Sequence, residues 1–289
     1  MLLLRMWLKH RLNGSFAMNM PRRIETIPSA IGGWAIDGCA YVGGLAALTG
    51  RSAYFIFVGP FRGQRLRPQR AVHQAFAVGV EAIPIVSLIL FFVGLIMALQ
   101  SAYELRRLGA MQFLAGAVAV SILRELGPLL TAIVVIGRSG SAFAAEIGTK
   151  KVTEEVDALR TMALDPVAFL VAPKFLAMLV MVPCLTIWAD MMGIVGGGMF
   201  GITSAGFTIG SYLQATRDSI VIRDMYTGLI KSALFGLVIT AVGCKEGFST
   251  GAGAEEVGRS TTSAVVTSIA MVILVDLVFT ALFYFINPT

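Results

Sequence analysis

Four ionisable residues lie inside long apolar stretches of this chain. Arg124 and Glu125 occur in SILRELGPLL. Lys231 occurs in GLIKSALFG, and Asp276 occurs in ILVDLVFTA. A charge at the centre of a bilayer costs ~2.5–3.5 kcal/mol even on the lenient insertion scale, so each must face protein, water or an opposite charge. Two of the four are basic and two are acidic, which predicts pairing. Such pairs could hold helices together, or they could line a substrate path or act as a relay between states.

The composition indicates that these stretches lie in a membrane. Of the 289 residues, 56% are hydrophobic and 14% are charged, against roughly 25% charged in a soluble domain. The mean hydropathy is +0.80. These values exclude a soluble enzyme, a disordered regulator and a secreted disulfide scaffold. The three cysteines are too few and too scattered for a disulfide framework or a metal cluster. We therefore predict an all-α integral membrane protein with no metal site.

Five stretches are long enough to cross the bilayer. A hydrocarbon core of ~30 Å takes about 20 residues of helix. Within a membrane domain covering residues 78–289, we predict spans at about 82–103, 113–137, 169–202, 225–244 and 261–286.

The basic residues orient these spans. With the N-terminus in the cytoplasm, 17 of the 23 Lys and Arg residues fall in cytoplasmic segments and four fall outside. Cytoplasmic loops carry an excess of Lys and Arg, so this orientation is favoured and the C-terminus lies outside. We expect Lys174 to extend to the inner interface.

The region before the spans has two predicted parts. Residues 1–28 form a basic cytoplasmic extension, and residues 29–77 form an interfacial helix region. Residues 31–60 are apolar but glycine-rich, and basic residues that favour the cytoplasm flank them on both sides. We therefore expect a helix lying in the cytoplasmic interface; a sixth span is the alternative.

The loop after the second span contains a predicted amphipathic helix at about 150–160. Its apolar face carries Val152, Val156 and Leu159. Acidic residues project elsewhere, namely Glu154, Glu155 and Asp157. Because the inner leaflet is negatively charged, it repels an acidic surface, so this helix is not expected to lie on the lipid headgroups. We expect this helix to dock a cytosolic partner.

Small residues recur at every fourth position of the third span. This stripe includes Gly193, Gly197 and Gly201. Small residues let helices in a membrane approach closely. The spacing favours packing within one subunit, with a contact between two subunits as the alternative.

The run LRELGPLLTAIVVIGRSGSAFAAEIGTKKVTEEVDALRTMALDP at 123–166 resembles the signature region of the MlaE family. These proteins are permease subunits of ABC transporters associated with Mce-domain proteins, and they move phospholipids or other lipids between membranes. The similarity extends from about residue 70 to the C-terminus, including KSALFG and VDLVFTAL. Two positions depart from the usual pattern. Lys150 stands where an apolar residue is common, and Glu155 stands where Gln is common.

The resemblance implies a homodimer in the bacterial inner membrane, with an N-terminal interfacial helix and five spans per subunit. The helix at 150–160 would be a coupling helix, with Lys151, Glu154, Glu155 and Asp157 at the ATPase. A lipid would occupy a cavity between the subunits, below a periplasmic ring of Mce-domain (MlaD-like) proteins. Matching positions in the family are implicated in lipid translocation, namely Arg124, Glu125, Lys231 and Asp276.

No G-x-x-x-x-G-K-[ST] motif occurs, so we expect no enzyme activity and no cofactor bound by this chain, with ATP and Mg²⁺ held by a partner ATPase. No basic surface is interleaved with aromatic residues, which argues against nucleic acid. Two alternatives remain. One is an ion-coupled secondary transporter that uses Glu125 or Asp276 as a proton carrier. The other is a membrane scaffold without transport.

Overall fold

The computed structural model describes residues 27–59 and 68–286, and these residues contain helices and no strand. The prediction of an all-α membrane protein is confirmed. The chain divides into two compact units, residues 1–43 and 44–289. In its described part, the first unit holds the beginning of helix α2 (Ile27–Phe57). The basic extension predicted for residues 1–28 lies outside the described residues except for its last two.

Helix α2 covers most of the region predicted as an interfacial helix. Its final turns belong to the second unit, where Leu45 and Ser52 are buried. The Arg51 guanidinium forms an ion pair of 2.7 Å with Asp165. The helix is thus confirmed, and its position in the interface stays a prediction.

Within the described residues, five helices are long and apolar enough to cross a membrane, as predicted. Two of them are much longer than the predicted spans, namely Gln69–Arg107 and Met111–Val152, whereas a third long helix, Val167–Thr203, is close to its predicted span. At 1.5 Å per residue, the 42 residues of the second helix extend about 60 Å, roughly twice the hydrocarbon core. These helices therefore continue beyond the bilayer. Hydropathy detects only the part that crosses it.

Each of the three long helices contains several segments. The first joins α3 (Pro68–Gly79), the 3₁₀ turn η2 (Val80–Ala82) and α4 (Ile83–Arg107). The second joins η3 (Met111–Phe113), α5 (Leu114–Ser121), the π-helical η4 (Ile122–Leu126), α6 (Gly127–Val135), the π-helical η5 (Ile136–Gly140) and α7 (Ser141–Val152). The third joins the π-helical η6 (Val167–Val171) and α9 (Ala172–Thr203). The remaining helices are α8 (Glu155–Thr161), α10 (Ile209–Ser219), α11 (Ile222–Phe248) and α12 (Ala254–Ile286).

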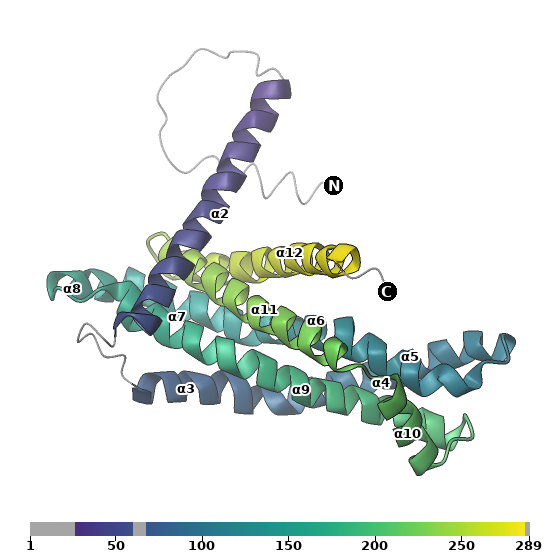
Figure 1. The fold of residues 1–289 in the computed structure, drawn as a ribbon. Helices are drawn as coiled ribbons and strands as arrows, with labels where there is room; N and C mark the ends of the chain where they lie inside the picture. Colours follow the sequence, from purple (N-terminus) through teal and green to yellow (C-terminus); the bar gives the residue numbers. More distant parts are fainter. Residues whose placement is uncertain (1–26, 60–67, 287–289) are drawn as a thin grey trace. The chain divides into compact units, whose positions relative to one another are not determined.

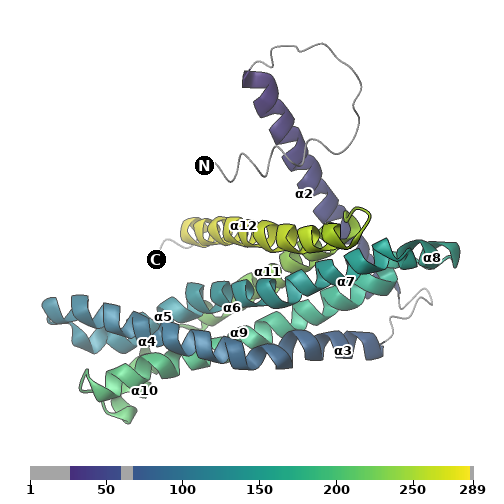
Figure 2. The same ribbon diagram turned by 180° about the vertical axis from the view of Figure 1, so that it is seen from behind.

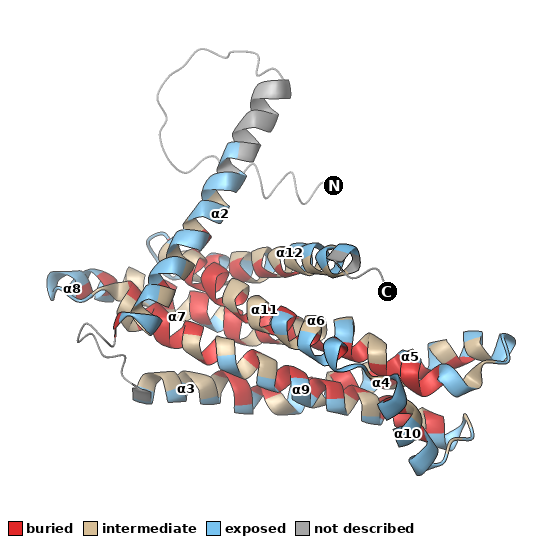
Figure 3. Cartoon of the chain, viewed as in Figure 1, coloured by how far each residue is buried: buried red, intermediate tan, exposed pale blue. Residues whose placement is uncertain are grey.

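The core of the second unit lies where α4, α6, α9 and α11 meet, and buried residues follow their facing sides (Figure 3). Helices α8 and α10 lie at opposite ends of this bundle (Figures 1 and 2). Helix α12 is the least covered span. In its most apolar stretch 11% of the residues are buried, against 61% in α11. The bundle is therefore tightly packed in its interior, and α12 is held mainly along one side.

The glycine stripe of α9 is buried within one chain. Gly193 packs against Ile122, Gly197 packs against Val118 and the hydroxyl of Tyr212, and Gly201 packs against the Tyr212 ring from α10. Burial raises the pKa of the Tyr212 hydroxyl, which donates to the carbonyl of Ile194 at 3.1 Å. The favoured reading of the stripe, packing inside a subunit, agrees with this arrangement.

Candidate functional site

Lys231 lies at the centre of a polar cluster that joins three spans. Its side chain is 2% exposed. The ammonium Nζ lies 2.6 Å from Oε2 of Glu125 on η4 and 2.9 Å from Oδ1 of Asp276 on α12. It also donates to Oγ1 of Thr280 at 2.8 Å. The predicted pairing therefore involves one lysine and two carboxylates.

Thr280 closes this cluster. Its hydroxyl accepts a hydrogen bond from Lys231 and donates one of 3.0 Å to Oε1 of Glu125. The contact between Asp276 and Lys231 is different, because Oδ1 of Asp276 is buried and has no hydrogen bond of good geometry within the described residues. The interaction there is ionic. With one cation and two carboxylates, the three side chains have a formal charge of −1 when all are ionised.

The backbone of η4 explains why Lys231 can reach this position. Pro128 has no N–H, so it cannot donate to the carbonyl four residues earlier, at Arg124. That carbonyl instead lies 3.5 Å from Nζ of Lys231. A side chain on Gly228 would collide with the carbonyl oxygen of Leu123, so glycine lets α11 approach the π-helical turn. π-helical turns are frequent at functional sites.

Arg124 does not join the cluster through its side chain. Its Nε lies 3.5 Å from Oδ1 of Asp224, at the start of α11. Asp224 is buried, whereas the Arg124 side chain is 49% exposed. The structure thus brings three of the four predicted residues together and gives the fourth a separate partner. Sequence reasoning missed Asp224 and Thr280. Thr280 could have been found because it is four residues after Asp276 on one helix face.

Comparison with known proteins identifies the family. The family model described as Permease MlaE matches residues 71–282. The chain belongs to the MlaE permease family. Over 213 residues the permease is 39% identical to a probable ABC transporter permease protein of Rickettsia typhi, covering 74% of this chain and 82% of the relative. It is 38% identical to a probable ABC transporter permease protein of Synechocystis sp., covering 77% and 82%. An intermembrane phospholipid transport system permease protein MlaE of Haemophilus influenzae is 32% identical, covering 81% and 91%.

Near α8 the permease has two helices where a single helix at 150–160 was predicted. Helix α7 ends at Val152, and α8 begins at Glu155. Glu154 between them has φ 60°, the left-handed region, which an α-helix cannot contain. The prediction of one continuous helix is therefore wrong. The break carries neither Gly nor Pro, which are the usual signals of a helix end.

The four residues predicted to contact an ATPase differ in orientation and in exposure. Lys151 points inward, and its Nζ donates to the carbonyl of Phe248 at 2.7 Å. Glu154, Glu155 and Asp157 are exposed. Asp157 forms an ion pair of 3.0 Å with Arg160. The acidic side of α8 is thus available for docking, whereas Lys151 fastens α7 to the end of α11. Docking itself stays a prediction.

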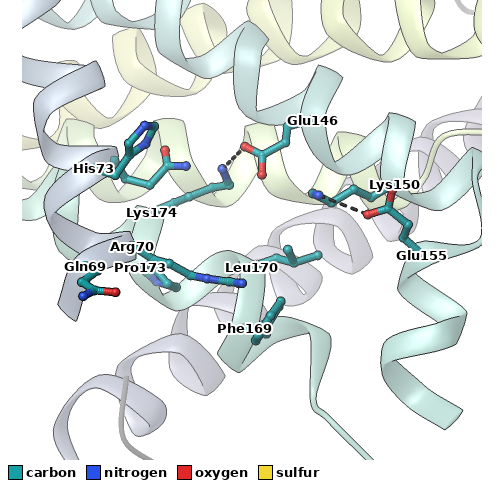
Figure 4. Close-up of a pocket in the computed structure, with 11 residues that line it drawn as sticks. Gln69, Arg70, His73, Glu146, Lys150, Glu155, Phe169, Leu170, Pro173 and Lys174 are labelled. Atoms are coloured by element: carbon teal, nitrogen blue, oxygen red, sulfur yellow. Dashed lines mark hydrogen bonds and ion pairs between the residues drawn. The ribbon is translucent and has the colours of Figure 1, made fainter. Parts of the chain in front are cut away.

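The two positions that are expected to depart from the family pattern contact each other. Nζ of Lys150 lies 3.2 Å from Oε2 of Glu155, and this ion pair spans the break between α7 and α8 (Figure 4). An apolar residue and a glutamine at these positions could not form it. The pair therefore joins the end of α7 to the beginning of α8.

Proposed function

We propose that this permease is the membrane subunit of an ABC transporter that moves phospholipids between the inner and outer membranes of a bacterium. A separate cytosolic ATPase would bind ATP and Mg²⁺ and supply the energy. The name of the Haemophilus influenzae relative, an intermembrane phospholipid transport permease, supports the substrate class. Family membership favours this function over an ion-coupled transporter or a scaffold.

The proposed orientation places α8 in the cytoplasm. Five spans bring the two ends of the membrane domain to opposite sides, and the distribution of Lys and Arg places the N-terminus inside. The C-terminus and α10 would then face the periplasm, where an MlaD-like Mce-domain protein would bind.

The observation that carries the proposed mechanism is the continuity of one helix between two sites. Glu125 on η4 and the last turn of α7 beside α8 belong to the same helix, Met111–Val152. Movement of α8 against an ATPase would therefore be transmitted along this helix to Glu125. Lys231 holds both Glu125 and Asp276, so the movement would alter the attachment of α12. We infer that the cluster is a relay between docking and the position of α12.

Two copies of the permease would form the transport path. The outer face of α12 exposes apolar side chains, namely Ile273, Leu274, Leu277 and Val278. Such a face suits lipid or a second subunit. A path beside α12 would lie within reach of Glu125, whose side chain is 39% exposed.

The docking part of the proposal is tested by reversing charge on α8. We expect Glu154→Lys combined with Glu155→Lys to abolish co-purification of the permease with its ATPase. Arg259→Glu is the control, because it reverses an exposed charge at the beginning of α12 and should leave co-purification intact. Retention of the ATPase by the double variant would contradict the docking assignment.

The energy source is tested in proteoliposomes. Phospholipid transfer should require the ATPase and ATP hydrolysis. Transfer that persists without the ATPase and follows a proton gradient would instead establish the ion-coupled alternative.

A further inference from the structure

A polar cavity of about 560 Å³ lies at the α8 end of the bundle, between α3, α7, α8 and the beginning of the third long helix (Figure 4). Its volume falls in the usual range for ligand pockets, about 300–1,000 Å³. The cavity is separate from the Lys231 cluster, since the two share no residue.

Positive charge exceeds negative charge in this cavity. Three permanent cations line it, Arg70, Lys150 and Lys174, against two carboxylates, Glu146 and Glu155. The two lysines each pair with one of the carboxylates. Within the described part of the chain, Arg70 has no carboxylate partner. The cavity therefore carries one cation more than its own acidic groups balance.

Arg70 is held in a position suited to an anion. Its guanidinium lies over the ring of Phe169, with Cζ 3.8 Å from the ring centroid. Stacking occupies the face of the guanidinium and leaves the N–H groups at its edge to bind a ligand. A planar fork of N–H donors matches the oxygens of phosphate, and such charge-assisted hydrogen bonds are the strong ones.

The two lysines differ in how easily each could exchange its carboxylate partner for a ligand. Lys174 is 1% exposed, pairs with Glu146 and lies 4.6 Å from the Phe143 ring centroid, so it is a fixed part of the wall. The expectation that it extends to the interface is wrong. Lys150 is different, because its pair with Glu155 is exposed at the surface. Surface ion pairs contribute only about 0–1 kcal/mol, so an anion can replace Glu155 as the partner of Lys150.

We propose that this cavity binds a phosphate-bearing anion through Arg70 and Lys150, and that the ligand is the headgroup of an anionic phospholipid of the inner leaflet. Arg70 lies in the first turn of a 39-residue helix that is about twice as long as the hydrocarbon core is thick. Its first turn therefore lies outside the hydrocarbon core, in the aqueous layer that borders the lipid phosphates. The choice of leaflet rests on the proposed orientation; the phosphate chemistry does not.

The experiment uses the purified permease without an ATPase, so it does not depend on transport. Short-chain phosphatidylglycerol is titrated, with short-chain phosphatidylcholine as the zwitterionic lipid and glycerol phosphate as the free phosphate. Binding is measured by native mass spectrometry and by thermal stabilisation. We expect Arg70→Gln to weaken phosphatidylglycerol binding about tenfold, the size of one lost charge-assisted hydrogen bond. Glu155→Gln removes the competitor for Lys150 and should strengthen binding.

Arg259→Gln is the matched control, because it removes an exposed cation outside the cavity. Equal phosphatidylglycerol binding by Arg70→Gln and Arg259→Gln would overturn the site, as would equal binding of phosphatidylcholine. If Arg70→Gln does not fold, Glu155→Gln decides, and unchanged affinity in that variant overturns the proposal. Glycerol phosphate binding as tightly as phosphatidylglycerol would support the phosphate site and overturn its assignment to lipid. Loss of ATPase docking or of transport would not bear on these results.

Discussion

Two lysines are buried in the described part of the permease, and they lie in different settings. Lys231 lies among two carboxylates and a hydroxyl that come from η4 and α12. Lys174 has one carboxylate partner, Glu146, and joins α9 to α7. Both side chains are almost fully buried, at 2% and 1% exposed. Burial alone therefore does not distinguish them, and the elements that they join do.

The difference lies in how firmly those elements are held. Helices α7 and α9 are both packed into the bundle, so the Lys174 pair reinforces contacts that already exist. Helix α12 is largely uncovered, and Lys231 is one of its few polar attachments. A buried ion pair is weak evidence for stability, but one that holds a lightly packed helix can act as a switch. The difference supports the proposal that the Lys231 cluster moves during transport and that Lys174 stays fixed.

The largest expected effect follows Lys231→Ala. This change leaves Glu125 and Asp276 close together with no cation. Breaking a buried pair in this way costs about 3–5 kcal/mol, reduced here by the partial exposure of Glu125. We expect poor assembly and no lipid transfer, measured by thermal unfolding in detergent and by transfer in proteoliposomes.

A neutral cluster separates the structural role from the functional one. The triple change Lys231→Met, Glu125→Gln and Asp276→Asn removes every charge and should restore most of the stability. Transfer should stay lost if the ions act as a relay. Recovery of transfer in this variant would show that the cluster serves stability alone.

A smaller effect is expected from Lys174→Met. The remaining Glu146 side chain is 40% exposed and can be hydrated, so we expect a loss of about 1–3 kcal/mol. Glu146→Gln in the same chain should recover it. Hydrogen exchange should increase near α7 and α9 and stay unchanged in α12. Increased exchange in α12 would remove the distinction between the two lysines.

Gly228→Ala tests whether the approach of α11 to η4 is needed for the cluster. The new Cβ would collide with the carbonyl oxygen of Leu123, and overpacking costs about 1–3 kcal/mol. Gly258→Ala in α12 is the control, because a Cβ there meets nothing within 4 Å. The control should be neutral or stabilising, since Ala favours helix over Gly. Equal thermal stability of the two variants would contradict the close approach.

The two regions also differ in how far sequence reasoning could reach. Charges in an apolar run are costly, so the amino-acid sequence alone is enough to single out Glu125, Lys231 and Asp276. Their meeting point depends on a π-helical turn, which has no periodic signal, and on Gly228, which belongs to a small-residue spacing with Ser232 and Gly236 that does not say which helix it approaches. The partner of Arg124 was missed because Asp224 lies just before the predicted start of the fourth span. At the α8 end, the last turns of the long helices are charged and look like a loop in the sequence. The full length of α7 could therefore not be predicted.

The turn after α8 provides the smallest and most local test. Ala163 has φ 57°, a conformation that costs an L-residue about 1–2 kcal/mol and that glycine adopts freely. Ala163→Gly should therefore stabilise the α8 turn by up to about 1 kcal/mol. Ala158 lies inside α8, where the same change should destabilise by about 1 kcal/mol. Hydrogen exchange of residues 155–164 should move in opposite directions in the two variants. Because neither residue touches a charged cluster, phosphatidylglycerol binding should be unchanged in both, and a parallel change would mean that the turn itself shapes the cavity.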